Sequence, residues 1–221
     1  MQAEEKLDCR VHKPEISNDD MCALHLKNLG LYQFSRIEHV NTDPRLVTAL
    51  VERWRPETHT FHLSVGETTL TLEDVSCLWG LPISGDVVVD DSVNDMYDLI
   101  ERCFGPGKAD QVIYSRRVRG EIVQSEGQIL LHYLRTNTNP LGEDATAEEI
   151  ERYTRAYIMD LFGSVLFPNC SGDGVPAMYL RFLDDLEPER VPNWGAVALA
   201  CLYRFVFFLF YALQSLLSCV P

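Results

Sequence analysis

Two periods of apolar residues follow each other early in the chain, and the change from one to the other defines its clearest region. From Asp43-Pro44, which suit an N-cap and a first helical position, apolar residues recur three or four positions apart. The members of this stripe are Leu46, Val47, Leu50, Val51 and Trp54. The pattern predicts a helix that ends at Arg55-Pro56, because proline lacks an N–H and disfavours the α conformation in the residue before it.

An alternating pattern replaces the helical one after Pro56. Residues 60–63 and 69–72 alternate polar and apolar side chains, and residues 65–67 between them suit a turn, so a two-stranded hairpin is predicted. Its apolar face holds Phe61, Leu63, Leu70 and Leu72. Thr71 and Asp74 then stand at capping-box spacing, which predicts a short helix that Gly80 ends.

The strongest helical stripe begins after residue 144. Thr146 and Glu149 form a second capping box, and the pattern predicts a helix that continues until Pro168. The apolar face of this helix consists of Ile150, Tyr153, Tyr157, Ile158, Leu161, Phe162 and Val165. We expect it to pack against a core built around Trp54 and Trp79.

Weaker patterns fill the remaining chain. They predict a short helix that ends at Gly30, a strand at Val87–Val89, a helix that starts at 90–92 and stops at Gly105, and a helix at 128–134. The chain is 221 residues long, which suits one domain with a sizeable core. The predicted fold class is α+β and mainly α-helical, with helices packed around short β-hairpins.

Charge and cysteine content narrow the function classes. The chain has 33 acidic and 19 basic residues, a formal charge of -14, which disfavours a general phosphate-binding surface. Nucleic-acid binding is therefore expected to be weak or indirect. The seven cysteines form no CxxC pair and are odd in number, which indicates a reduced intracellular compartment with thiols as small apolar fillers.

His59 and His62, with Glu57 and Glu67 nearby, are the candidate metal ligands. Residues three apart on a strand point to opposite faces, so the two imidazoles need not converge, and no cysteine or third histidine stands at ligand spacing. We favour histidines that are hydrogen-bonded and tie the hairpin to neighbouring helices. No metal and no other cofactor is predicted.

Three further patterns have an ordinary structural interpretation. Asp90-Asp91 and Asp184-Asp185 would suit a metal-dependent nuclease, but adjacent aspartates more often cap helices and face water. The one basic cluster, Arg116-Arg117-Val118-Arg119, is more often a solvated face in so acidic a chain. None of the four lysines precedes a phosphate-binding loop, so a pyridoxal phosphate site is not expected.

Several ordered blocks of the chain resemble the plant mobile domain, a family often called "aminotransferase-like". The blocks lie at 50–75, 149–157, 166–168 and 193–204. The residues that carry the resemblance are Trp54, Arg55, Pro56, Glu57, Thr58, His59, Phe61, His62, Gly66, Glu67, Asp74, Arg152, Tyr153, Arg155, Trp194, Gly195, Tyr203 and Arg204. The resemblance places an N-terminal flank with a short helix at 1–42 and the domain at 43–204, and it supplies no catalytic residue.

The resemblance also implies a function. The family suggests a nuclear, non-catalytic interaction module with roles in the silencing of transposable elements, genome stability and meristem development. It implies protein partners, among them a nuclear phosphoprotein phosphatase of the kind sometimes fused to this domain. The phosphatase itself is not in this chain, which has no Gly-Asp-x-His-Gly or Gly-Asn-His-Glu motif. The alternative is a transposon-derived, metal-dependent enzyme that acts on nucleic acid.

The C-terminal end departs from the family pattern. From Trp194 to Pro221 only Arg204 is charged, and residues 205–213 form an uninterrupted apolar run. We therefore expect a divergent apolar tail at 205–221, of the kind a translated intron would give, after a domain that is incomplete at its C-terminal end. A second alternative is a membrane anchor at 196–217, in which Arg204 would cost about 2.5–3.5 kcal/mol.

Overall fold

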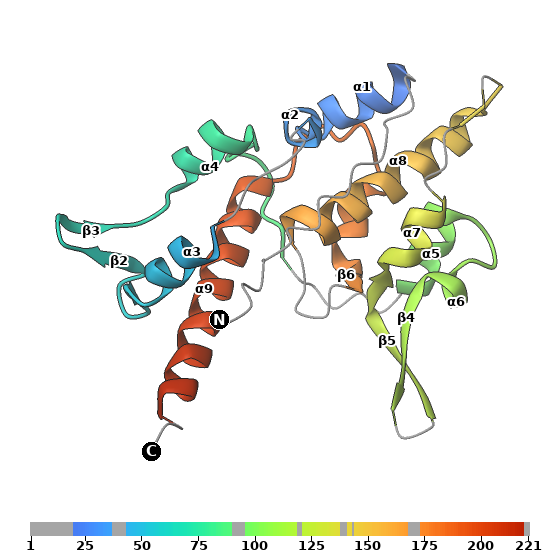
Figure 1. Cartoon of the computed structure of the whole chain (residues 1–221). Coiled ribbons are helices and arrows are strands. Elements are labelled where there is room, and N and C mark those ends of the chain that lie inside the picture. Colours follow the sequence, from blue (N-terminus) through green and yellow to red (C-terminus); the bar gives the residue numbers. More distant parts are fainter. Residues whose placement is uncertain are drawn as a thin grey trace.

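The computed structural model of the protein describes residues 20–36, 43–89, 96–118, 121–137, 141–142, 144–167 and 173–218. Helices predominate in these ranges, and short antiparallel strands form two small sheets. This confirms the predicted fold class. In Figure 1 the long helix α9 (Trp194–Ser218) runs between a hairpin region with α3 and α4 and a larger helical region around α8.

Helix α8 (Ala147–Leu161) is the centre of the larger region. Its predicted capping box is present, because the Thr146 backbone N–H donates to Glu149 and the Glu149 N–H donates to Thr146 Oγ1. The helix continues as one π-helical turn, η1 (Phe162–Leu166). The elements packed around it are α1 (Asp20–Asn28), α5 (Met96–Phe104), α7 (Leu131–Asn137) and the 3-10 helix η2 (Ala177–Leu183).

The apolar face predicted for α8 is correct, but the core it joins is not the predicted one. Phe162 is fully buried and packs against Trp194, with the ring centroids 4.8 Å apart. Trp79 lies only at the edge of this core, against Phe34, and Trp54 lies outside it. The prediction failed because α9, far along the chain, brings Trp194 into the place assigned to Trp54.

Helix α3 (Pro44–Val51) begins as predicted and ends earlier. The Asp43 side chain accepts from the Arg45 N–H at 2.9 Å, which confirms the N-cap. Trp54 was predicted on this helix, but it lies in strand β1 (Trp54–Arg55). There it is paired with Phe61 of β2 (Thr60–Leu63). Strand pairing with an aromatic neighbour outweighs the helical spacing that placed Trp54 on the stripe.

The predicted hairpin forms with a different second strand. Strand β3 (Gly66–Thr68) pairs with β2 and replaces the expected strand at 69–72, so the turn lies at 64–65 and not at 65–67. The reason is the next helix, α4 (Leu72–Trp79), whose capping box takes up Thr71. Gly80 ends α4 at φ 66°, as predicted, a left-handed conformation that glycine adopts without strain.

A second sheet lies beside the larger core. It consists of β4 (Ile113–Val118), β5 (Glu121–Leu130) and β6 (Gly174–Pro176), all antiparallel. The helix predicted at 128–134 begins only at Leu131, because the pairing of residues 128–130 with β6 keeps them extended. In Figure 1 the β4–β5 hairpin projects away from the helices, after the short helix α6 (Ala109–Val112).

Two further predictions have separate outcomes. Val87–Val89 forms no strand ladder, and the isolated bridge in this segment joins Asp86 to Pro192. The predicted helix start at 90–92 lies outside the described residues, and that helix is seen as α5. The N-terminal helices are α1, which leads to Gly30 at φ 68°, and α2 (Tyr32–Ser35).

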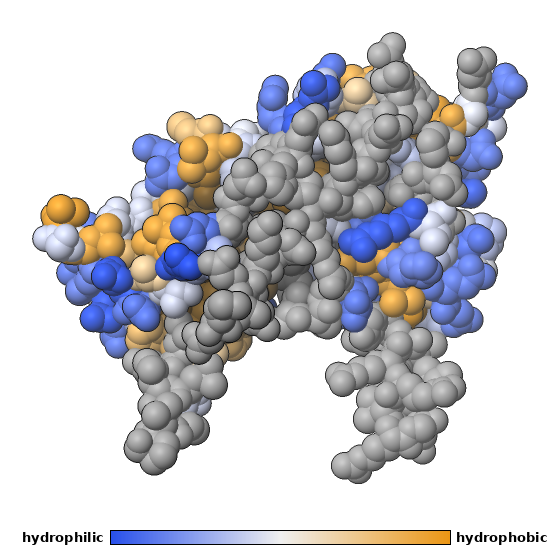
Figure 2. Space-filling model, viewed as in Figure 1, coloured by the Kyte–Doolittle hydropathy of each residue, from blue (hydrophilic) through white to orange (hydrophobic). Residues whose placement is uncertain are grey.

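Helix α9 is continuous across the boundary predicted at residue 204. Its first turns are largely buried, and its last turns extend beyond α3 and the β2–β3 hairpin toward the C-terminus in Figure 1. Figure 2 shows apolar side chains gathered over α4 and the tip of the β2–β3 hairpin, where Leu78 and Val65 are exposed. Among the described residues, exposed apolar side chains therefore occur at the hairpin tip, on α4 and on the second half of α9.

Candidate functional site

Four aromatic residues join the hairpin to α9, and we call them the hairpin cluster: Trp54, His59, Phe61 and Tyr203. The Trp54 ring is fully buried, with its centroid 4.8 Å from Phe61 and 5.5 Å from Tyr203. The imidazole of His59 stacks on the Tyr203 ring at 5.6 Å and 6°. The first and last family blocks of the sequence therefore meet in one place.

Hydrogen bonds reinforce the aromatic contact. The Tyr203 hydroxyl donates to the Leu70 carbonyl at 2.5 Å and lies 3.0 Å from Thr69 Oγ1. The Thr69 hydroxyl donates in turn to the His59 carbonyl at 2.7 Å. His59 has φ 52°, unusual for a residue other than glycine, and this turn conformation presents its ring to α9. Tyr203 therefore connects both ends of the hairpin to α9.

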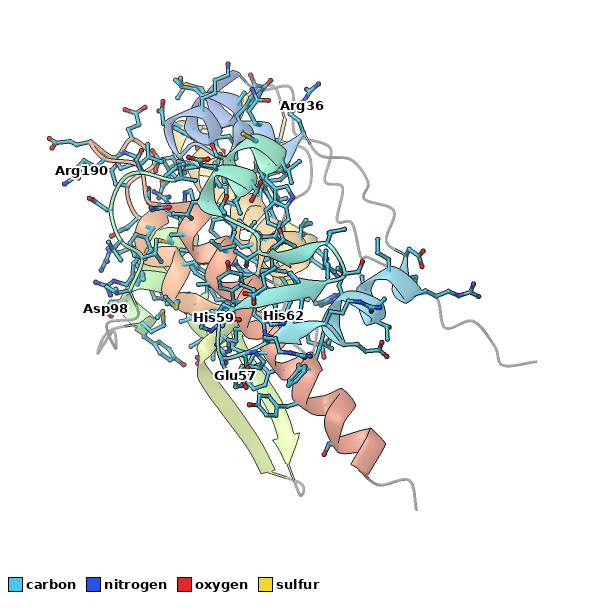
Figure 3. All side chains as sticks on the ribbon, turned by 90° about the vertical axis from the view of Figure 1, so that its left-hand side faces the viewer. Arg36, Glu57, His59, His62, Asp98 and Arg190 are labelled. Atoms are coloured by element: carbon cyan, nitrogen blue, oxygen red, sulfur yellow. The ribbon has the colours of Figure 1, made fainter. Side chains whose placement is uncertain are left out.

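The two candidate metal ligands do not converge. His59 stacks on α9, whereas His62 stays within the hairpin, with Nε2 3.1 Å from Glu67 Oε1. Figure 3 shows both histidines and Glu57 at the hairpin end that lies beside α9. Among the described residues, no group of three or more His, Cys, Asp or Glu side chains has metal-site geometry. Of the two, only His59 ties the hairpin to a helix, and it does so by ring stacking.

The other residues of the first family block shape turns. Arg55 donates to the Trp54 carbonyl at 3.2 Å, and the Thr58 and Thr60 hydroxyls are 2.7 Å apart. Pro56 and the exposed Glu57 occupy the turn between β1 and β2, and Gly66, at φ 132°, opens β3. These residues therefore determine the local shape of the hairpin and its turns.

Asp74 holds the start of α4. Its carboxylate accepts from the Thr71 N–H at 2.8 Å, and this backbone bond is the main cause that lowers the pKa of Asp74. Glu149 has the same arrangement with Thr146 at the start of α8, with its pKa lowered for the same reason. Asp74 is half-buried and Glu149 is exposed, and each carboxylate accepts hydrogen bonds from its N-cap threonine, so both serve to start a helix.

The three motif residues of α8 point in different directions. Arg155 is buried, and its Nε and Nη2 donate to the carbonyls of Leu183 and Asp184 at 2.8 and 3.0 Å. Arg152 forms an ion pair with Glu148. Tyr153, which lies between the two arginines in the sequence, is buried. Arg155 therefore donates to the carbonyl groups at the C-terminal end of η2, whereas Arg152 pairs with Glu148 on a more exposed surface.

The Asp184-Asp185 pair is part of the same structure. The Asp184 carboxylate lies 3.0 Å from Arg102 Nη2, and the Asp185 carboxylate accepts from the Glu187 N–H at 2.8 Å. Cys103 Sγ lies 3.8 Å from Asp184, and burial raises the pKa of this thiol to about 12. Asp90 and Asp91 are outside the described residues.

Trp194 and Gly195 form the junction between α9 and the rest of the fold. The indole Nε1 donates to the Leu29 carbonyl at 3.1 Å, and the Gly195 N–H donates to the Pro82 carbonyl at 2.8 Å. A Cβ on Gly195 would lie 2.7 Å from Ile83 Cγ2 and 2.9 Å from the Pro82 oxygen. Only glycine allows this approach, which is why the Trp-Gly pair starts the helix.

Sequence reasoning missed one buried polar group. Asp160 is fully buried on α8, and its Oδ1 accepts from Ser164 at 2.8 Å and from Arg135 Nε at 3.3 Å. The available signal was an aspartate directly between Met159 and Leu161 in an apolar stripe. This polar group joins α7 to α8.

Arg204, the last motif residue, is exposed beside a groove of about 380 Å³. The groove lies between the segment at 87–88 and the first half of α9. Its lining consists of Val87, Val88, Met178, Asn193, Ala196, Val197, Ala200, Cys201 and Arg204. It is apolar except at Asn193 and Arg204.

The second half of α9 is largely exposed. Phe207, Phe208, Leu209 and Tyr211 are 39%, 54%, 43% and 49% exposed. One stretch of the described residues, Trp194–Ala212, is long and apolar enough to cross a membrane, with a mean hydropathy of 1.8 and 17% of it buried. Length and composition alone support this, and Trp194 lies in the core.

Comparison with known proteins finds relatives of this chain. Three Arabidopsis thaliana proteins are similar: "Protein MAIN-LIKE 2" is 41% identical over 179 residues, covering 81% of this chain and 25% of that protein. "Protein MAINTENANCE OF MERISTEMS" is 32% identical, covering 81% and 35%. "Serine/threonine-protein phosphatase 7 long form homolog" is 36% identical over 188 residues, covering 84% and 13%.

The chain thus spans about a third or less of the length of these relatives. No solved structure matches it. The family described as "Plant mobile domain" matches residues 30–218, which include all eighteen motif residues and the whole of α9. The hairpin cluster, the Arg155 contacts and the Trp-Gly junction all lie within the matched residues, and the chain belongs to the plant mobile domain family.

Proposed function

We propose that this chain is a non-catalytic protein-interaction module that works in the nucleus as part of a longer protein. The main support is how the family residues are used. His59, Asp74 and Arg155 are the chemically versatile ones, and each is occupied by a stacking or hydrogen-bonding contact within the fold. These contacts within the fold support a structural role for the three residues.

The exposed aromatic face of α9 provides the interaction surface. Phe207, Phe208 and Tyr211 lie together, since the Phe207 ring is 4.7 Å from Tyr211 and 6.0 Å from Phe208. Contiguous exposed apolar residues of this kind commonly mark protein interfaces, which are enriched in aromatic side chains. This clustering is the observation that carries the proposal.

The proposed partner is a nuclear phosphoprotein phosphatase. One similar protein is named as a phosphatase 7 long form homolog, so this domain and that name occur together in one relative. Another relative is named for meristem maintenance, which fits roles in meristem development, silencing of transposable elements and genome stability. For this chain these roles are proposals.

Co-immunoprecipitation from plant nuclei tests the interaction. The tagged chain should recover the phosphatase, and the double variant Phe208→Ser with Tyr211→Ser should lose most of it, because the aromatic face is removed. Val65→Ser is the matched control, since Val65 is 92% exposed at the hairpin tip. Equal recovery by wild type and double variant, or exclusion of the tagged chain from nuclei, would contradict the proposal.

The enzyme alternative has its own test. Purified chain would be incubated with Mg²⁺ or Mn²⁺ and a DNA or RNA substrate, and phosphodiester cleavage measured for wild type, His59→Ala and Asp184→Asn. We expect no cleavage. Metal-dependent cleavage that either substitution abolishes would replace the interaction module with a transposon-derived enzyme.

Membrane attachment is a second candidate, favoured by the hydropathy of Trp194–Ala212 alone. A span there would require Trp194 to leave its contact with Leu29 and Tyr203 to leave Leu70. We expect the chain to be released from plant membranes by alkaline carbonate. Retention in the pellet would favour the anchor.

A further inference from the structure

The segment Val87–Val89 has no strand partner within the described part of the chain, and its neighbour Asp86 forms only an isolated bridge with Pro192. Asp86 donates to the Val191 carbonyl at 3.2 Å and accepts from the Asn193 N–H at 2.9 Å. Beyond Asp86 the side chains alternate as on a strand: Val87 is 74% exposed, Val88 packs on the core, and Val89 is 50% exposed. Two exposed β-branched residues on a segment with alternating burial and no strand partner favour pairing with an added strand.

The groove beside this edge has the dimensions of a side-chain pocket. Val87 and Val88 form one wall, and Ala196 and Ala200 of α9 form the other, where small side chains leave the space open. Asn193, its polar amide, is already engaged with the Ile83 carbonyl and the Ala196 N–H. An apolar side chain is therefore the chemistry that fits the interior.

Arg204 gives the groove its charge. It is the one ionised residue in the groove lining, and among the described residues its recorded ring contact is with Phe208, at 5.6 Å. The carboxylate of Asp86, which precedes Val87 in the chain, lies 3.3 Å from Arg190 Nε. An exposed guanidinium at the mouth of an apolar groove favours a ligand that carries a carboxylate.

We propose that this groove binds an extended peptide segment of a partner protein, with an apolar side chain next to an acidic one. The peptide backbone pairs with Val87–Val89, its apolar side chain enters the groove, and its carboxylate meets Arg204. Strand addition between an unpaired edge and a helix is an established mode of peptide recognition. This inference rests on the proposed function and names the class of partner.

Fluorescence anisotropy with a labelled hexapeptide, Thr-Val-Leu-Glu-Val-Thr, tests the proposal on the whole chain. We expect saturable binding that Arg204→Glu weakens about tenfold, equivalent to about 1.4 kcal/mol. Ala200→Phe, which fills the groove, should weaken it similarly. Ala200 and Arg204 are exposed, so both variants should keep the wild-type melting temperature. Arg53→Glu is the charge-matched control, because Arg53 is exposed just after α3 and its side chain donates to the Ala49 carbonyl.

A charge exchange makes the test specific. The peptide with lysine in place of glutamate should bind the wild type weakly and regain affinity with Arg204→Glu. Hydrogen exchange on the saturated complex should slow at residues 87–89. Equal binding by wild type and Arg204→Glu, no saturable binding, or a peptide-free dimer that Arg204→Glu dissolves would each overturn the inference. The phosphatase experiment on Phe208 and Tyr211 would still decide the interaction module separately.

Discussion

The larger core and the hairpin cluster both contain a fully buried tryptophan, but they hold it differently. Trp194 packs against Phe162 and Phe182, and its indole N–H is bonded to Leu29. The Trp54 indole N–H is also buried, yet it has no hydrogen-bond partner among the described residues. Trp194 is surrounded by elements from several parts of the chain, whereas Trp54 depends on its own hairpin and on α9.

This difference has a consequence for stability. A residue enclosed by many elements contributes to global unfolding, while one held by a hairpin and a single helix contributes to local opening. Family residues occur in both regions, with Arg155 and Trp194 in the first and His59 and Tyr203 in the second. We therefore expect the two regions, which both contain family residues, to differ in stability.

The largest expected effect separates the two tryptophans. Trp194→Ala should lower the free energy of unfolding by about 3–5 kcal/mol, because it empties a large closed site. Trp54→Ala should first release the hairpin, with faster amide exchange at 60–68 before global unfolding. Urea denaturation with hydrogen exchange measures both. The comparison breaks down if Trp54→Ala destabilises the whole chain as much, and Leu46→Ala, at an exposed site, should change little.

The next effect concerns the polar side of the larger core. Arg155→Met keeps most of the aliphatic stem but removes the donors to Leu183 and Asp184, so it should cost about 1.5–3 kcal/mol. Arg152→Met is the control: its ion pair with Glu148 is partly exposed and should contribute less than about 1 kcal/mol. Chemical denaturation decides between them. Equal losses would mean that Arg155 is no more structural than Arg152.

A smaller effect should be confined to the hairpin cluster. Tyr203→Phe keeps the stacking on His59 and removes the hydroxyl that bonds Leu70, which should cost about 1 kcal/mol. Amide exchange should quicken at 60–70 and stay unchanged at 156–162. Tyr211→Phe, on the exposed face, serves as control. Faster exchange in α8 would show that the two regions unfold together.

The smallest effect tests one capping box in each region. Thr71→Ala and Thr146→Ala should each cost about 1 kcal/mol. The capping bonds lower the pKa of Asp74 and Glu149 below their ordinary values of 3.8 and 4.5. Their stabilisation is present above those values and is lost as the pH falls through the lowered folded pKa values.

Both variants should therefore show a weaker loss of stability below about pH 4.5 than the wild type. Thermal melts between pH 3 and pH 7 measure this slope. Thr48→Ala, a threonine within α3 whose hydroxyl bonds the Pro44 carbonyl, controls for general acid destabilisation. Unchanged slopes in the two capping variants would contradict the assignment.

Local signals in the sequence predicted local structure well. Both capping boxes, the Asp43-Pro44 start of α3 and the glycine stop of α4 need only residues within one turn of each other, and all are present. Helical spacing also identified the buried face of α8. Such features depend on backbone geometry, which a short segment carries by itself.

Features that depend on distant partners could not be predicted in this way. The spacing of apolar residues predicts a helix at Trp54, but its pairing with Phe61 places it in a strand. The same holds for residues 128–130, which pair with β6. The candidate site shows the same limit. His59 and Tyr203 were both named from the sequence, but their stacking joins residues 144 positions apart, which no local spacing predicts.

Helix α9 sets the angle between the two regions through its rotation. Trp194 and Tyr203 are nine residues apart, and at about 100° per residue they point to opposite sides of the helix axis. A single inserted residue between them would leave each contact chemically intact but turn Tyr203 away from His59 by about 100°. The phase of one helix, more than any single bond, determines where the hairpin sits.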